Sequence, residues 1–110
     1  MIQESISEIE AKIREAQSLS DEKRNELLRL LSTLKTEVSG LAETDADRAR
    51  SIAGFAKVSV HEAIREEKHP KLLNLSLKGL SISVEGFENS HPKLVDIVNS
   101  ICVSLSSFGI

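Results

Sequence analysis

Histidine, cysteine and clustered acidic side chains are the residues of this chain that could bind a metal ion or transfer a proton. The only histidines are His61, His69 and His91, and the only cysteine is Cys102. Helical metal sites commonly place two histidines at i and i+4, whereas His61 and His69 are eight positions apart and no Cys or acidic cluster completes a ligand set. We therefore predict no metal site and no cofactor.

Motifs for nucleophilic catalysis or phosphate binding are also missing. Serines are frequent, but the chain contains no G-x-S-x-G elbow, no glycine-rich phosphate loop and no Ser-Lys spacing. The adjacent carboxylates Glu66 and Glu67 fall at a predicted helix end that faces solvent. We predict no catalytic residue, and the protein is not expected to be an enzyme.

One short polar segment is a candidate interaction corner, formed by Glu88, Asn89, Ser90, His91 and Pro92. A proline fits the first turn of a helix, where its missing amide does no harm, so Ser90 or His91 is expected to cap the helix that follows. The alternative is that these five residues form a surface that contacts a partner.

Composition excludes several partner classes. The net charge is −3 with both signs interspersed, and the chain has three Phe but no Trp or Tyr, so we expect no nucleic-acid binding. The N-terminus is acidic and periodic, and no apolar run approaches the ~18 residues of a membrane span, so we expect neither a secretory signal nor membrane insertion. The single Cys102, flanked by Ile101 and Val103, is expected to be buried and unreactive in a reducing cytoplasm.

The elements that would position these residues are helices. Apolar residues recur in alternating steps of four and three, as they do along a coiled-coil seam, in segments starting near Ile2, Asp21, Thr44 and Pro92. Ser20 is the expected N-cap of the second segment, which should end near Gly40, and Thr44 with Asp47 resembles a capping box for the third. We predict one all-α domain, 1–110, of four or five amphipathic helices arranged as antiparallel hairpins with heptad seams.

Residues 73–87 can be interpreted in two ways. Alternating apolar residues around Lys78-Gly79 are compatible with a β-hairpin, whereas Leu73, Leu77, Leu80, Val84 and Phe87 continue the helical seam. Lys-Gly is not a favoured hairpin turn, and a lone hairpin would have no sheet to join, so helix is favoured. Because Leu75 and Ile82 project from the opposite side, this helix is expected to be buried around most of its circumference.

Charge is distributed unevenly along the chain. Only six of the 31 Asp, Glu, Lys and Arg residues follow Pro70. Residues 1–68 are therefore expected to form charged amphipathic helices, and residues 69–110 an apolar helical hairpin at the heart of the protein.

The C-terminal segment GFENSHPKLVDIVNSICVSLSSFGI resembles a bacterial family, domain-of-unknown-function family 4404, whose members end in an F-E-x-S-H-P segment and an L-S-x-x-G-I terminus. The matching residues are Phe87, Glu88, Ser90, His91 and Pro92, then Leu105, Ser106, Gly109 and Ile110. Residues 40–54 and the alanine-rich helix look like an insertion relative to shorter members. The resemblance implies a short helical protein and favours helix for residues 73–87; it brings no activity, substrate or cofactor.

Two function classes follow from these features. The chain has more apolar helix surface than one small bundle can hide, so we predict a homo-oligomer, with a dimer favoured. The preferred function is a non-catalytic protein–protein interaction or scaffold module of the bacterial cytoplasm. The alternative is a small regulator that binds a metal or metabolite between helices, with His69 and His91 at the two helix starts.

Overall fold

Helices account for all the regular structure of residues 2–109, the part of the chain that the computed structural model describes. The helices are α1 (Ile2–Glu15), α2 (Asp21–Ala42), α3 (Ala46–Ile64), α4 (Pro70–Ser83) and α5 (Pro92–Ser106), followed by the short 3-10 helix η1 (Ser107–Gly109). The all-α prediction is confirmed. Ile110, the last residue of the predicted terminal motif, lies outside the described residues.

The ambiguous segment is helical, since α4 covers Pro70–Ser83 and contains Lys78 and Gly79 in its second half. The helix ends earlier than its apolar pattern suggested. Val84 is the C-cap, and Gly86 follows at a φ of +95°, a conformation that favours glycine. Phe87 therefore belongs to the turn between α4 and α5.

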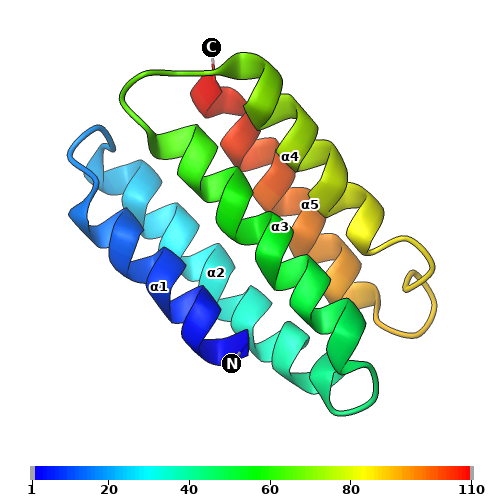
Figure 1. The fold of residues 1–110 in the computed structure, drawn as a ribbon. Coiled ribbons are helices and arrows are strands. Elements are labelled where there is room, and N and C mark those ends of the chain that lie inside the picture. Colours follow the sequence, from blue (N-terminus) through cyan, green and yellow to red (C-terminus); the bar gives the residue numbers. More distant parts are fainter. Residues whose placement is uncertain (1, 110) are drawn as a thin grey trace.

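The five helices run alternately up and down (Figure 1), with α1 and α2 as one antiparallel pair and α4 and α5 as another. Helix α3 lies between the two pairs and packs against all four other helices. We expected the C-terminal hairpin to be the heart of the protein; buried apolar residues come from all five helices, and α3 contacts each of the others. Half of the eight buried residues of α3 are alanines (Ala49, Ala53, Ala56 and Ala63), and such small side chains let several neighbours approach one helix.

The helix starts agree with the sequence in part. Ser20 is the N-cap of α2, and its hydroxyl accepts a hydrogen bond from the Lys23 amide at 3.2 Å. The N-cap of α3 is Asp45, whose Oδ1 accepts from the Arg48 amide at 3.1 Å, so Thr44 was the wrong choice. The Thr44 hydroxyl instead donates to the Leu41 carbonyl, because α2 continues past Gly40 to Ala42.

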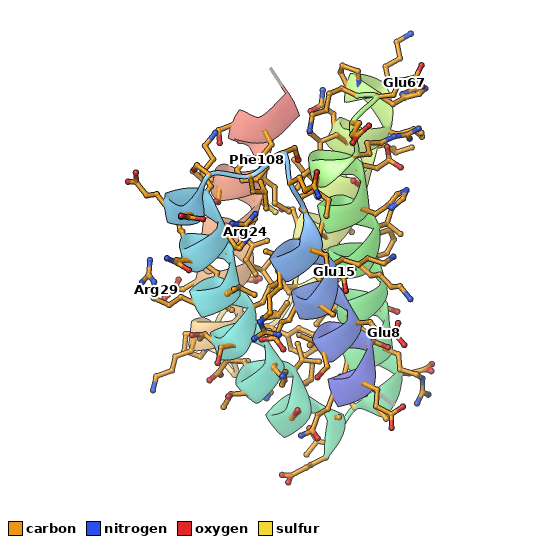
Figure 2. All side chains as sticks on the ribbon, turned by 90° about the vertical axis from the view of Figure 1, so that its left-hand side faces the viewer. Glu8, Glu15, Arg24, Arg29, Glu67 and Phe108 are labelled. Carbon is orange, nitrogen blue, oxygen red and sulfur yellow. The ribbon has the colours of Figure 1, made fainter. Side chains whose placement is uncertain are left out.

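Arg24 closes the other end of the first hairpin. Its guanidinium donates to the carbonyls of Ile13, Ala16 and Leu19, which lie at the C-terminal end of α1 and in the connection to α2. Figure 2 shows Arg24 directed between the two helices, whereas Arg29, also on α2, points away from the body of the protein. The Ile13 carbonyl also accepts from the Ala16 amide at 3.3 Å, and the guanidinium adds a charged donor to it and to the carbonyls of Ala16 and Leu19.

Ion pairs also join α1 to its neighbours. Glu10, which is buried on α1, lies 2.7 Å from the Lys35 ammonium of α2. Glu8, on the side of α1 next to α3 (Figure 2), accepts a hydrogen bond from Lys57 at 3.0 Å. The first hairpin and α3 are thus held together by charge as well as by the apolar core.

None of the described helices has the length and apolar character needed to cross a membrane.

Candidate functional site

The predicted interaction corner lies in the connection between α4 and α5, and its first residue is used for local structure. Both oxygens of the Glu88 carboxylate accept from the Gly86 amide, at 2.9 and 3.1 Å. This side chain closes the turn that the positive φ of Gly86 begins. Asn89 and Pro92 are exposed beside it.

His91 occupies the N-cap position of α5 without using its ring as a cap. Its amide donates to the Phe87 carbonyl at 2.8 Å, its ring meets the Phe87 ring edge-on at 5.4 Å, and Nδ1 lies 3.0 Å from the Ser90 hydroxyl. We expected Ser90 or His91 to cap α5. His91 does occupy the N-cap position, but neither side chain makes a capping hydrogen bond to the helix. At the corresponding start of α4, Nδ1 of His69 does accept from the Leu72 amide, at 3.3 Å.

Arg48 of α3 also belongs to this corner, and sequence reasoning missed it. Its guanidinium lies 4.5 Å from the centre of the Phe87 ring and donates to the carbonyls of Ser83, at 3.4 Å, and Glu85, at 2.9 Å. The guanidinium thereby satisfies acceptors at the end of α4 and stacks on an aromatic face. The residues are more than thirty positions apart, so no local pattern could have indicated the contact. The corner ties α3 to the α4–α5 turn.

The three histidines do not form a site. His69 and His91 begin α4 and α5, which are antiparallel, so the two rings lie at opposite ends of that pair (Figure 1). A shared ligand between His69 and His91 is therefore incompatible with the fold. His61 is exposed on α3, with Nε2 3.9 Å from the Glu62 carboxylate. Within residues 2–109, no three His, Cys, Asp or Glu side chains are grouped as a metal site would require.

Cys102 is half-buried on α5, and its Sγ lies 3.8 Å from the Leu77 carbonyl of α4. Burial raises the pKa of the thiol, which favours the protonated form and lowers its reactivity. The thiol is less buried than predicted, but its chemistry is that of an unreactive packing residue.

The exposed large apolar side chains are concentrated on α3 and α4. Of the six large apolar side chains that are exposed among the described residues, five belong to these helices, and we call them the α3–α4 face: Phe55, Val58, Leu72, Leu75 and Ile82. The sixth, Val103, is on α5. Helix α4 is therefore not buried around most of its circumference as predicted: Leu75 is 66 % exposed and Ile82 49 %.

The physical reason lies in the position of α4 at the edge of the bundle (Figure 1), where it packs mainly against α3 and α5. Two neighbours cover only part of a helix surface. The Phe55 ring of α3 reaches across α4 to Gly79, where a Cβ atom would lie 2.4 Å from Phe55 Cε1. Gly79 thus provides a shallow seat for the ring between Leu75 and Ile82.

A cleft of about 560 Å³ lies on the other side of α3, between α1, α2 and α3. Its walls are mostly small or apolar, including Ile2, Ala42 and Ala53, and it is also lined by Arg50 and Lys57. Each of these cations already has a carboxylate partner, Asp47 at 3.0 Å and Glu8 at 3.0 Å. The cleft could hold a small amphipathic molecule, but among its described lining residues no charge is left without a partner that would select one.

The chain was compared with protein families, curated proteins and solved structures. The family model described as "Domain of unknown function (DUF4404)" matches residues 27–110, which span most of α2 and all of α3, α4 and α5. The match also contains residues 40–54 and the alanine-rich helix α3, which looked like an insertion. No curated protein and no solved structure matches the chain.

Proposed function

The chain belongs to the DUF4404 family, and we propose that it acts as a non-catalytic protein–protein interaction or scaffold module. The α3–α4 face is the observation that carries this proposal. It gathers five large apolar side chains on two adjacent helices, whereas scattered single apolar residues are ordinary on protein surfaces. On α4 these side chains follow helical spacing, so the face suits a helix or a helical surface of another chain.

The sequence contains no motif for nucleophilic catalysis or phosphate binding, and this supports a binding role over an enzymatic one. In the predicted corner, Glu88, Ser90 and His91 make local contacts, and Asn89 is exposed beside them. The three histidines of the chain lie apart from one another. The lone, protonated Cys102 supports a reducing compartment, and we propose the bacterial cytoplasm.

Photo-crosslinking tests this proposal directly. A photoreactive amino acid would replace Leu75 or Ile82 in the full chain expressed in cells, and Val103 would carry the same group as a matched control. All three positions are exposed and apolar, but only the first two lie on the α3–α4 face. We expect protein adducts from positions 75 and 82 and few from 103. Equal labelling at all three positions, or none at 75 and 82, would refute an interaction through this face.

The second candidate is a regulator that binds a metabolite in the cleft between α1, α2 and α3. The apolar walls beside Arg50 and Lys57 favour this candidate. A ligand at a hundred times its dissociation constant stabilises a protein by about 2.7 kcal/mol, so a thermal-shift screen of small amphipathic molecules would detect it. Gly54→Leu, which fills the cleft, should abolish any shift that arises there. The interaction proposal expects no shift.

A further inference from the structure

We propose that the partner of the α3–α4 face is a second copy of this chain, docked antiparallel through α4 to form a symmetric dimer. This inference rests on the proposed function, because it names the partner of the same face. Three features of the described residues support it: the spacing of the apolar residues, the seat at Gly79 and the charges at the two ends of α4.

The exposed seam of α4 has the spacing of a coiled coil. Leu72, Leu75, Gly79 and Ile82 follow one another in steps of three, four and three. In an antiparallel pair whose two-fold axis passes beside Leu77, residues equally distant from Leu77 face each other. Leu72 then meets the partner's Ile82, and Leu75 meets the partner's Gly79.

The contact at Gly79 is complementary in shape. Leu75 is the most exposed apolar side chain of α4, at 66 %, while Gly79 has no side chain and is covered by the 42 % exposed ring of Phe55. In the antiparallel arrangement each Leu75 packs on the partner's Phe55 ring. The projecting Leu75 side chain and the Phe55 ring that would receive the partner's Leu75 therefore lie on the same face of one chain. A closed two-fold dimer requires such a self-complementary surface.

The charges of α4 point to the same arrangement. Lys71 lies in the first turn and Glu85 just beyond the last, and both are exposed without an ion-pair partner within residues 2–109. Both charges oppose the helix dipole, which favours anions at the N-terminus and cations at the C-terminus. Lys71 and Glu85 lie six and eight residues from Leu77, so an antiparallel second copy places the partner's Glu85 two residues beyond the position opposite Lys71. This offset is roughly 3 Å along the helix, which the two long side chains can span at both ends of the interface. A uniformly acidic partner helix would match Lys71 and Lys78 but would be repelled by Glu85.

One feature limits the strength of this dimer. Lys78 lies near the two-fold axis and faces the partner's Lys78, and the seam extends over a helix of only 14 residues. We therefore expect reversible association in the micromolar range rather than an obligate dimer.

Sedimentation velocity of the purified full chain over a range of concentrations tests the proposal. We expect the mass to rise from the 12.1 kDa monomer toward the dimer as concentration increases. Leu75→Glu and Ile82→Glu should abolish this rise, and Val103→Glu, the matched control on α5, should not. All three positions are exposed, so circular dichroism should show unchanged folding in each variant.

A charge exchange tests the antiparallel register. Lys71→Glu or Glu85→Lys alone should weaken the dimer about tenfold, because each replaces two attractive contacts by repulsive ones. The double variant Lys71→Glu/Glu85→Lys should restore the affinity, and Lys78→Gln should increase it. An acidic partner would instead be lost with Lys71→Glu and not recovered in the double variant.

The outcomes separate this inference from the proposed function. A wild-type chain that stays monomeric into the millimolar range refutes the dimer, and so does a dimer that survives Leu75→Glu and Ile82→Glu. If such a monomer nevertheless gives heterologous adducts at position 75 in cells, the interaction proposal stands and the second copy is wrong. A dimer whose charge variants are not rescued by the exchange refutes the antiparallel arrangement.

Discussion

Gly79 offers a sharp test of the packing between α3 and α4, because adding one methyl group there has two opposing effects. Alanine stabilises a helix interior by about 1 kcal/mol relative to glycine. At Gly79, however, the new Cβ would lie 2.4 and 2.6 Å from Cε1 and Cδ1 of Phe55, closer than real Cβ contacts allow. The Phe55 ring is 42 % exposed and must therefore turn away from α4 into solvent.

The stability that Gly79→Ala loses can be estimated from the part of the Phe55 side chain that is buried in the wild-type protein. Complete burial of a Phe side chain contributes roughly 1.5–3 kcal/mol, and more than half of that is at stake for Phe55, so about 1–2 kcal/mol is lost. Gly54→Ala is the matched control, since it lies inside α3 and its Cβ would meet no atom within 4 Å. We expect Gly54→Ala to raise the free energy of unfolding by about 1 kcal/mol. The free energy of unfolding of Gly79→Ala should be about 1–2 kcal/mol lower than that of Gly54→Ala.

Urea denaturation at concentrations where the chain is monomeric would measure both variants, and a double-mutant cycle isolates the cause. In a Phe55→Ala background the clash is absent, so Gly79→Ala should stabilise the chain as much as Gly54→Ala does. In melting experiments a 1 kcal/mol difference corresponds to about 4–8 °C for a domain of nearly this size. Equal stabilisation by Gly79→Ala and Gly54→Ala in the wild-type background would show that Phe55 does not rest on Gly79.

Three further predictions concern polar residues. Arg24→Met should destabilise the chain by about 1.5–3 kcal/mol in urea denaturation, because three carbonyls at the end of α1 lose a charged donor, whereas the outward-pointing Arg29→Met should change little. Ser59→Ala should stabilise by about 1 kcal/mol, since the Ser59 hydroxyl is buried in α3 and has no hydrogen-bond partner among residues 2–109; a loss of stability would indicate a partner for it. The hydrogen bond from Lys57 and its positive charge lower the pKa of Glu8, so the stabilisation from this pair is complete above the ordinary glutamate pKa and is lost as pH falls through the lowered one. Lys57→Met should raise the Glu8 pKa toward its ordinary value in an NMR titration, and an unchanged pKa would contradict the pairing.

Much of the fold could be predicted because its signals are local. Alternating steps of four and three define the buried stripe of each helix, and Pro70 and Pro92 mark the starts of α4 and α5. Periodicity also decided correctly between helix and hairpin for α4. Helix caps were less predictable, because a cap depends on backbone angles as well as residue type. Asp45 rather than Thr44 caps α3, and His91 takes the cap position of α5 without a side-chain hydrogen bond.

The candidate corner was located correctly as the start of a helix, but its construction was not visible in the sequence. Arg48 reaches the corner from a different helix. The Phe87 ring contacts both the Arg48 guanidinium and the His91 ring. Whether the corner also binds a partner stays a prediction. The contacts of Glu88 and His91 account for their presence in structural terms.

The sequence by itself determined that this chain forms amphipathic helices and where most of them begin, because those properties depend on residues within one or two turns of each other. Only the tertiary structure decided which stripes remain uncovered. A helix at the edge of a bundle can bury only the sides that its neighbours reach, and α4 has two main neighbours. Leu75 and Ile82 are therefore exposed although they belong to an apolar helix, and Phe55 finds its seat at Gly79, twenty-four positions away.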